Sequence, residues 1–461
     1  MATRKPKLNF WQIWNLSFGF LGVQIGYSLQ NSNTSSIFQS LGADVSHLSY
    51  FWLAAPLAGM IIQPIVGMFS DGTWTRFGRR IPYILGGALI STIALLLMPN
   101  CPVLLAVAPL AMGAFILLFM DLSFNVTMQP FRALVADMLD DSQKTTGYVV
   151  QTFLINLGAV IGAFLPLIMT WLGVSDEAVP GQVSRHIAWS YYAGGIILLL
   201  TVLVTAFKTK EYPPKEFAEY NGLEYKDAGG TGNSGSAGNL HGQSSDAAPQ
   251  RQGFISLMRN IPKVMLQLGV TQFFSWAALF LMWTYLKPAI TGIVTDPATG
   301  ALLSEGATQT WVGVLNGIYP IPACIAAIFL GRIAAKFGNK AVYAACLLFG
   351  AAGFGSLLLI HDKYMMMLPM VGIGIAWAGI LAMPYSILSR YVDAGNMGAY
   401  MGIFNFTITI PQIVIGLTGG LIVKWCFDSE AISMLGLAGV FMLLAAISVA
   451  FVGRGRTENG K

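Results

Sequence analysis

The chain has 461 residues, of which 55% are hydrophobic and only 10% are charged, with a formal net charge of +5. Soluble domains carry about 25% charged residues, so this composition indicates a helical protein that crosses a membrane many times. The small, dispersed net charge argues against nucleic acid as a partner. The four cysteines and four histidines are widely separated, which argues against a zinc site or a disulfide framework.

Twelve apolar segments are long enough to cross a bilayer. They are expected at residues 10–30, 47–70, 81–99, 103–136, 146–172, 186–207, 262–287, 309–335, 340–360, 364–390, 398–424 and 431–453. The fourth is long for a single span, so we expect one end of it to project from the bilayer. The basic and then apolar N-terminus has no small-residue cleavage site after it, which favours a retained first helix.

A polar stretch separates two groups of six segments. It contains GGTGNSGSAGNLHGQSSDAAPQ, and such Gly- and Ser-rich composition is typical of a flexible linker. We therefore expect an N-terminal six-helix bundle over residues 1–207, a flexible cytoplasmic linker over 208–261 and a C-terminal six-helix bundle over 262–461. The predicted fold class is an all-α membrane protein of twelve transmembrane helices in two pseudo-twofold repeats.

The positions of the cationic residues predict the orientation of the helices. If the N-terminus is cytoplasmic, most Lys and Arg residues fall on the cytoplasmic side, and Arg185, Lys287, Lys363 and Lys424 fall outside. This is the positive-inside bias, and it supports an even number of helices. We expect a multi-pass protein of the cell inner membrane with both termini in the cytoplasm.

The fourth segment contains DLSFNVTMQPFRALVAD, a polar stripe in an apolar helix. Asp121, Asn125, Gln129 and Arg132 have spacings of 4, 8 and 11 from the first residue, which places them on one helix face. A polar stripe that faced lipid would be costly, so it should face protein or a water-filled cavity. Asp121 is the one carboxylate expected in the middle of a span, and Asn125 and Gln129 are candidates to bind substrate hydroxyl groups.

Other polar and aromatic side chains in the spans are candidates to bind substrate. In the first segment, Gln24, Tyr27, Ser28 and Asn31 share one face. Amides of this kind either join helices by hydrogen bonds or recognise hydroxyl groups, and deep tryptophans either anchor the protein or contact the apolar face of a sugar ring. The predicted substrate-binding residues are Gln24, Asn31, Asn125, Gln129, Asn156, Gln272, Trp276, Asn316 and Trp377.

Between the second and third segments, GMFSDGTWTRFGRRIPY combines an acid with a tight basic loop. Asp71 at the helix end can accept hydrogen bonds from a neighbouring helix N-terminus. Arg79 and Arg80 are within reach of Asp137 at the inner end of the fourth segment. We therefore expect Asp71, Arg76, Arg79, Arg80 and Asp137 to form a cytoplasmic gate that breaks when this side opens. The second half repeats the loop as GRIAAKFGNK, without the acid.

Three stretches resemble proton-coupled sucrose transporters of plants and their bacterial relatives, near the glycoside–pentoside–hexuronide cation symporters of the major facilitator superfamily. These are GVQIGYSLQ, IIQPIVGMFSDGTWTRFGRRIPY and DLSFNVTMQPFRALVAD. The resemblance implies that Asp121 binds the coupling proton and that Arg132 acts in substrate binding or coupling. Two features differ from that family. Gly72 replaces the basic residue usual after the loop aspartate, and WTYLKP lacks the acids found after the seventh helix of plant members.

The expected function is proton-coupled import of a disaccharide, such as sucrose, maltose or a related α-glucoside, by alternating access. A sodium-coupled or facilitative glycoside or hexuronide carrier is the main alternative, and a sugar sensor that does not transport is another. No nucleophile–base pair or metal cluster is apparent in the spans, so we expect no enzymatic activity and no cofactor besides the coupling proton. The expected partners are the sugar and the lipid bilayer, with the protein a monomer.

Overall fold

The computed structural model describes residues 5–41, 54–105, 107–175, 182–223 and 254–453, and these residues are mostly helical. The first half contains α1 (Phe10–Ser40), α3 (Ala54–Asp71), α4 (Ile81–Leu97), α5 (Cys101–Leu104), α6 (Pro109–Met138), α7 (Lys144–Trp171) and α8 (Arg185–Lys208). The second half contains α11 (Lys263–Ile290), α12 (Glu305–Ile318), α13 (Pro320–Phe337), α14 (Asn339–Leu357), α15 (Met367–Leu388), α16 (Met397–Phe404), α17 (Phe406–Cys426) and α18 (Ala431–Val449).

The predicted all-α membrane fold is confirmed. Within the described ranges, ten helical stretches are long and apolar enough to cross a membrane by length and composition. The helices α1 and α3 complete the twelve expected spans. The eighth span is divided into α12 and α13 at Tyr319, where Pro320 and Pro322 follow and cannot continue the hydrogen-bond ladder.

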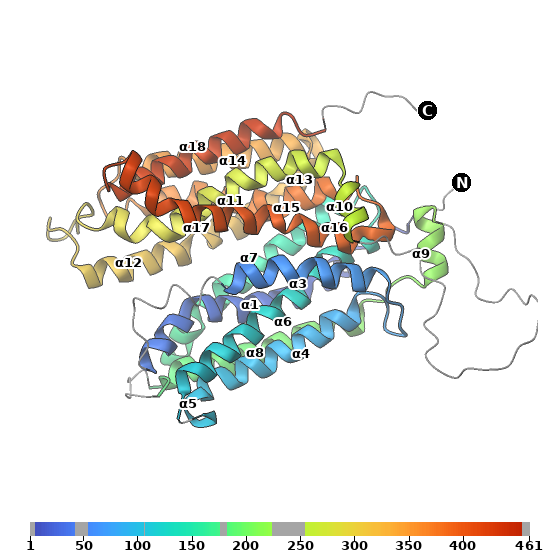
Figure 1. The fold of residues 1–461 in the computed structure, drawn as a ribbon, viewed down its shortest axis with the longest axis horizontal. Helices are drawn as coiled ribbons and strands as arrows, with labels where there is room; N and C mark the ends of the chain where they lie inside the picture. Colours follow the sequence, from blue (N-terminus) through green and yellow to red (C-terminus); the bar gives the residue numbers. More distant parts are fainter. Residues whose placement is uncertain (1–4, 42–53, 106, 176–181, 224–253, 454–461) are drawn as a thin grey trace, which may run out of the picture.

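The two halves form two bundles that lie side by side, coloured blue to green and yellow to red in Figure 1. Their internal packing is equivalent. In the first half α1 packs on α7 and α8, and α4 on α6 and α8; in the second, α11 packs on α17 and α18, and α14 on α15 and α18. The halves meet through the matching pairs α3–α16 and α13–α7. In each of these pairs a helix of one half packs on a helix of the other, and a pseudo-twofold axis would relate the two pairs, as the predicted repeats require.

Several element boundaries differ from the sequence prediction. α1 continues to Ser40 rather than ending near residue 30, and residues 47–53 of the second predicted span lie outside the described residues. The fourth span begins at Pro109, after the separate short helix α5. Proline is favoured at the first position of a helix, where its missing N–H group would have no partner in the helix, which explains this start.

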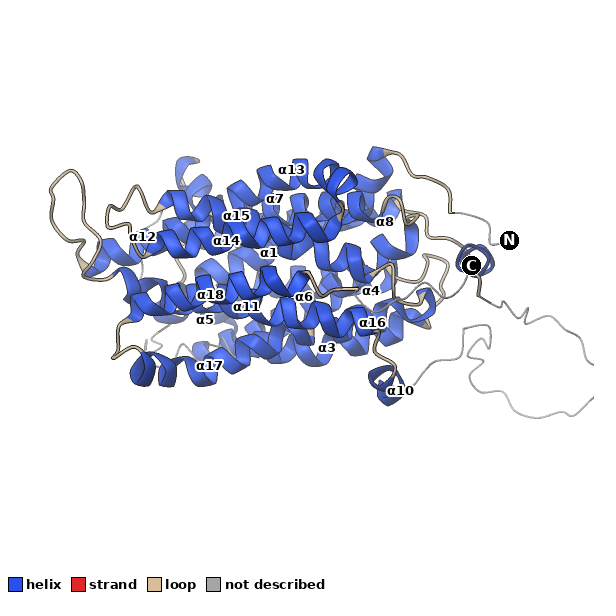
Figure 2. Cartoon of the chain, turned by 90° about the horizontal axis from the view of Figure 1, so that it is seen from above, coloured by secondary structure: helices blue, strands red, loops and turns tan. Residues whose placement is uncertain are grey.

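Two short helices lie inside the predicted linker. They are α9 (Pro214–Asn221) and α10 (Phe254–Arg259), so the described ends of residues 208–261 are structured. The Gly- and Ser-rich centre of that segment lies outside the described residues, and its flexibility stays a prediction. Figure 2 shows α10 beside α16, at the end of the bundle where α8 finishes and α11 begins. We call this the linker end.

Backbones of the two halves approach closely at the linker end. A Cβ atom on Gly67 of α3 would overlap the carbonyl oxygen of Gly398 of α16, and one on Gly402 would overlap the carbonyl oxygen of Gln63. Glycine at these positions therefore permits the contact between α3 and α16. The contact positions the charged network described next.

Candidate functional site: a charged network and a polar α6 face

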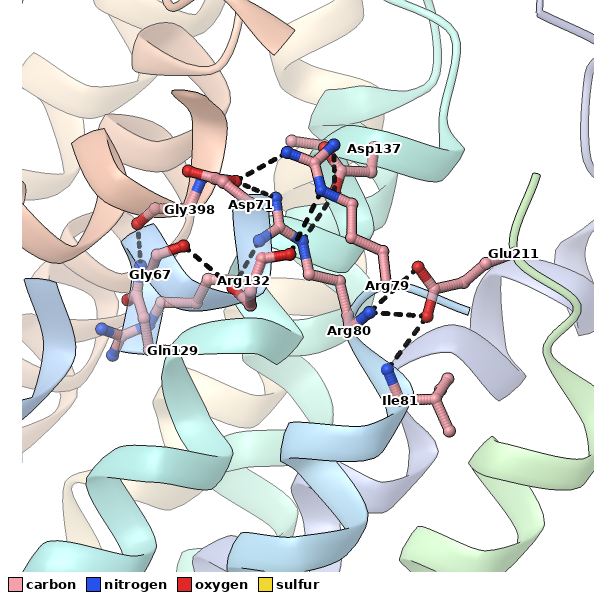
Figure 3. A network of polar contacts seen from close by, with 12 residues as sticks. Gly67, Asp71, Arg79, Arg80, Ile81, Gln129, Arg132, Asp137, Glu211 and Gly398 are labelled. Atoms are coloured by element: carbon pink, nitrogen blue, oxygen red, sulfur yellow. Dashed lines mark hydrogen bonds and ion pairs between the residues drawn. The ribbon is translucent and has the colours of Figure 1, made fainter. Parts of the chain in front are cut away.

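A buried ion network joins the α3–α4 loop to α6 at the linker end (Figure 3). Arg80 donates to Asp137 at 2.8 Å and to Asp71 at 2.6 Å, and Arg79 donates to the same oxygen of Asp71 at 2.8 Å. Side-chain exposure is 1% for Arg79 and 0% for Arg80, and it is 8% for Asp71 and 4% for Asp137. The predicted contact between the loop arginines and Asp137 is confirmed.

The network also crosses to the second half of the protein. Asp71 accepts hydrogen bonds from the backbone N–H groups of Gly398 at 2.9 Å and Ala399 at 2.7 Å, at the start of α16. These amides have no partner within their own helix, and the positive end of the helix dipole favours a carboxylate there. Arg79 also donates to the carbonyl oxygen of Gly395 at 3.1 Å. The network therefore ties the halves together at this end.

The surroundings of Arg79 and Arg80 shift the pKa values of the two side chains in opposite directions. Burial alone would lower the pKa of Arg80, but the carboxylates of Asp137 and Asp71 outweigh burial and raise it above its ordinary value. Burial and the neighbouring cation lower the pKa of Arg79. Its guanidinium carbon lies 4.7 Å from the ring centroid of Phe217 in α9. This aromatic ring of the linker segment therefore stabilises the positive charge of Arg79.

Glu211 is part of this site, although the sequence did not predict it. Its carboxylate accepts hydrogen bonds from the backbone N–H groups of Arg80 at 2.8 Å and Ile81 at 2.9 Å, where α4 begins (Figure 3). Loss of hydration raises the pKa of Glu211, and the backbone donors oppose that rise. By contrast, the predicted gate residue Arg76 is exposed and stacks on Phe77, so it lies outside the network.

A second group of contacts joins the halves at the linker end. The hydroxyl groups of Thr145 and Ser386 are 2.8 Å apart, and Asn339 donates to Ser386 at 2.8 Å. Lys144 donates to the carbonyl oxygen of Ser389 at 2.8 Å. Asn339 belongs to the second-half repeat of the α3–α4 loop, where the acid is missing. Hydrogen bonds to hydroxyl, amide and carbonyl groups therefore join the halves there, and the donors include the cationic side chain of Lys144.

The polar face of α6 points into protein along its whole length, as predicted. Asp121 and Gln129 are buried, and Asn125 and Arg132 are partly buried. Asn125 accepts from Gln63 of α3 at 2.6 Å. Gln129 donates to the carbonyl oxygen of Gly398 of α16 at 2.8 Å, and the guanidinium carbon of Arg132 lies 4.8 Å from the ring centroid of Tyr385 in α15. The stripe therefore runs from the first half of the protein to its contact with the second.

The carboxylate of Asp121 is 1% exposed and accepts a hydrogen bond from Nε2 of Gln30 in α1 at 2.5 Å. Among the described residues, Asp121 forms no ion pair with Arg132 or another cation. The sequence did not predict Gln30 as a site residue. It lies about 120° around α1 from Gln24, at 100° per residue, and so falls outside the predicted polar face of that helix.

Of the residues predicted on the first-half helices, Gln24 is partly buried, whereas Asn31 is exposed. Asn156 of α7 is buried and donates to the carbonyl oxygen of Thr152 at 2.8 Å. Ser28 donates to the carbonyl oxygen of Ala159 at 2.9 Å, which is a contact between helices. The polar face of α1 therefore contains at least one helix-joining contact, one of the two alternatives that the sequence left open.

The second half contains an aromatic cluster on α11, α15 and the break between α12 and α13. The ring centroids of Trp276 and Trp377 are 5.4 Å apart, and Trp283 lies 6.3 Å and 6.0 Å from them. Tyr319, at the break between α12 and α13, lies 6.1 Å from Trp377. The structure thus brings the two predicted tryptophans together and adds Trp283 and Tyr319, which were not among the predicted site residues.

Several buried polar atoms of the predicted site residues, and the hydroxyl group of Tyr385, retain hydrogen-bonding capacity. Gln272 is buried and accepts from Tyr343 at 3.0 Å. Buried side-chain polar atoms of native proteins nearly always have a partner, so groups without a protein partner are available to water or substrate. Among the described residues these include the Gln129 Oε1, Arg132 Nη1, Asn156 Oδ1, Gln272 Nε2, Trp276 Nε1, Asn316 Oδ1 and Tyr385 hydroxyl atoms.

Comparison with protein families gives two matches that together span most of the chain. Residues 37–228 match the family described as MFS/sugar transport protein. Residues 268–461 match the family described as Major Facilitator Superfamily. The boundary between the matches falls in the segment that separates the two bundles.

Curated relatives include plant sucrose transport proteins. Sucrose transport protein SUT1 of Oryza sativa subsp. japonica is 24% identical over 480 residues, which cover 94% of this chain and 85% of the relative. Sucrose transport protein SUC4 of Arabidopsis thaliana is 23% identical over 444 residues, with 87% and 81% covered. Both are named as transport proteins rather than enzymes.

Solved structures of similar fold include two proton-coupled symporters. The Escherichia coli fucose:proton symporter FucP has a TM-score of 0.69 at 12% identity, with 96% of this chain and 99% of that chain covered. The proton:xylose symporter XylE has a TM-score of 0.63 at 12% identity, with 95% and 94% covered. The fold, the two family matches and the full-length relatives agree, and the chain belongs to the major facilitator superfamily of membrane transporters.

Proposed function

We propose that the protein is a proton-coupled symporter that imports a disaccharide, such as sucrose, maltose or a related α-glucoside. The similarity to plant sucrose transport proteins over most of both chains supports a sugar as the cargo. The proposed coupling ion is the proton. We place the protein in the cell inner membrane as a monomer.

The observation that carries this proposal is the buried position of the Asp121 carboxylate and its contact with a neutral side chain. It is a buried carboxylate whose identified side-chain partner is the neutral amide of Gln30. Burying an ionised carboxylate without a cation is costly, whereas burying the neutral acid with a hydrogen-bond partner costs far less. Asp121 is therefore suited to binding a proton together with the cargo and releasing it when its surroundings change.

The two walls of the site suit a sugar. Sugars present hydroxyl groups at their edges and C–H groups on their ring faces. The α6 face contributes Asp121 and Asn125, which can exchange hydrogen bonds with hydroxyl groups. The cluster of Trp276, Trp283 and Trp377 presents aromatic surface for a ring face.

The linker end is proposed to be cytoplasmic, as the positive-inside bias predicts. In the present structure, the bonds from Asp71 to α16 and from Arg79 to Gly395 hold this end together. Alternating access then requires these bonds to break, so that sugar and proton leave to the cytoplasm. Asp71, Arg79, Arg80 and Asp137 are the proposed gate, and Arg76 is not part of it.

The competing proposal is a sodium-coupled or facilitative carrier of glycosides or hexuronides. The partly buried Arg132, with an unpaired nitrogen, favours a hexuronide because it offers a cation for the sugar carboxylate. A sodium site generally uses several oxygen ligands, and a single buried carboxylate fits a proton better. The non-transporting sensor is the least favoured because the relatives are named as transport proteins.

Uptake into proteoliposomes tests the function. Labelled sucrose, maltose and a glucuronide are offered with an inward proton gradient, an inward sodium gradient or none. We expect sucrose or maltose to accumulate with the proton gradient, and Asp121→Asn to lose accumulation but keep sugar exchange. Accumulation driven by sodium alone, or uptake of the glucuronide alone, would replace the proposal with the corresponding alternative.

A further inference from the structure

We propose that Gln30 is a positioning residue that gives Asp121 a hydrogen-bond partner in both of its protonation states. The inference rests on the proposed function, in which Asp121 binds and releases a proton. It concerns a residue outside the predicted site and follows from the contact between α1 and α6.

Gln30 is held in place by its surroundings. Its side chain is completely buried, and its backbone carbonyl oxygen accepts a hydrogen bond from the Thr34 hydroxyl at 2.7 Å. The neighbouring Leu29 carbonyl oxygen accepts from Tyr191 of α8 at 3.2 Å. The Thr34 bond lies within α1, and the Tyr191 bond ties α1 to α8 one residue before Gln30, so Gln30 approaches Asp121 from a helix held by its neighbour.

The two ends of the Gln30 amide have different partners. Nε2 donates to Oδ1 of Asp121, whereas Oε1 has no hydrogen-bond partner among the described residues. An ionised carboxylate only accepts hydrogen bonds, whereas a carboxylic acid also donates one. Rotation of the amide about its last side-chain torsion presents Oε1 in place of Nε2, so the same side chain accepts from the protonated acid.

The other polar groups near Gln30 and Asp121 have different partners from the Asp121 carboxyl group. Asn125, one turn along α6, donates to the backbone carbonyl of Asp121 rather than to its carboxylate. Among the described residues, the charged or titratable groups near this pair include Tyr27 of α1 and Arg132 of α6, and Tyr27 lies close enough to Asp121 and Arg132 to interact with both. From α3, Gln63 reaches Asn125 and not the carboxylate. Gln30 is thus the neutral partner that adapts to the proton.

The consequence is that the buried carboxyl group of Asp121 keeps a hydrogen bond whether or not it holds a proton. With Gln30, neither protonation state leaves the buried carboxyl group without a partner. An apolar side chain of similar length would leave the ionised state without its donor, and proton release to the cytoplasm would become the unfavourable step. The change would appear in coupled uptake more than in sugar exchange.

The test uses Gln30→Met, which keeps length and removes the amide, in the full chain reconstituted in liposomes. The variant loses a hydrogen bond in both protonation states, and the bond to the charged carboxylate is the stronger by roughly a factor of ten in equilibrium. We therefore expect the pH of half-maximal proton-driven uptake to move about one unit alkaline, with sugar exchange kept. Gln30→Asn, which keeps an amide with shorter reach, should move the profile in the same direction by less.

The matched control is Gln151→Met. Gln151 is also a buried amide, but it donates to the backbone carbonyl oxygen of Phe131 at 3.3 Å. Its substitution should leave the pH profile in place. A profile for Gln30→Met that coincides with wild type would overturn the inference while leaving the proposed function intact, and absence of proton-driven uptake in the wild type would instead refute the function.

A double variant separates positioning from a general structural role. If Gln30 acts through Asp121, then adding Gln30→Met to Asp121→Asn should not reduce sugar exchange further. An additional loss of several-fold in the double variant would show that Gln30 supports the fold and not the proton site. Thermal unfolding of each variant confirms that the compared proteins are folded.

Discussion

The contact between Gly67 and Gly398 makes a direct prediction about the conformational equilibrium. A Cβ atom on Gly67 would overlap the carbonyl oxygen of Gly398, which is backbone and cannot rotate away. Overpacking of a close contact costs about 1–3 kcal/mol. The cost applies only while the linker end is closed, because opening separates α3 from α16. At about 1.4 kcal/mol per factor of ten, Gly67→Ala should shift the equilibrium roughly 5- to 150-fold toward opening at this end.

The matched control is Gly86→Ala on α4. A Cβ atom there meets nothing within 4 Å, so the substitution changes helix propensity without affecting the contact. Both glycines lie inside helices, and the gain of about 1 kcal/mol from Gly to Ala is common to both conformations. The comparison therefore isolates the overlap at the junction.

Double electron–electron resonance measures the result. Spin labels replace two exposed residues, Arg76 in the α3–α4 loop and Lys336 in the last turn of α13, in a variant without the native cysteines. We expect Gly67→Ala to add a population at longer distance and Gly86→Ala to match the parent. Identical distance distributions for Gly67→Ala and the parent would show that the α3–α16 contact does not control opening.

Three further predictions concern stability and binding. Asp137→Asn leaves a buried arginine without its partner and should cost about 3–5 kcal/mol, whereas Asp141→Asn, whose side chain is 74% exposed, should cost at most about 1 kcal/mol; thermal unfolding compares them. The pKa of Glu211 is raised in the folded protein, so the unfolded state ionises first as pH rises. The stability of wild type relative to Glu211→Gln should therefore fall between the ordinary and the raised pKa, and equal pH dependence of the two melting temperatures would contradict this. Trp377→Leu should weaken sugar binding about tenfold by tryptophan fluorescence titration, whereas Trp425→Leu, at a site 77% exposed, should not; similar affinities would exclude the aromatic wall.

The parts of the site that follow from short-range sequence patterns were predictable. Asp71, Arg79 and Arg80 lie within ten residues, and helical periodicity places Asp137 on the inner end of α6. The spacing of the α6 stripe predicted its orientation because one helix fixes the relative directions of its own side chains. The same reasoning found the two bundles and the spans.

The parts that depend on contacts between distant segments were not predictable. Gln30 and Asp121 are 91 residues apart, and their contact depends on the rotation of α1 against α6. Glu211 reaches the start of α4 from a segment with no distinctive local pattern. Arg76 was grouped with Arg79 and Arg80 by proximity in sequence, but the turn directs it to solvent. One helix period does not determine how two helices are rotated against each other.

The central claim is that Asp121 carries the proton that moves with the sugar. Solid-supported membrane electrophysiology measures this directly, as the current that follows a sugar pulse at equal pH on both sides of the proteoliposome membrane. The account predicts a sustained inward current with sucrose or maltose in the wild type, and none in Asp121→Asn despite retained sugar exchange. A sugar-induced current of wild-type size in Asp121→Asn would contradict the account and place the proton on another residue.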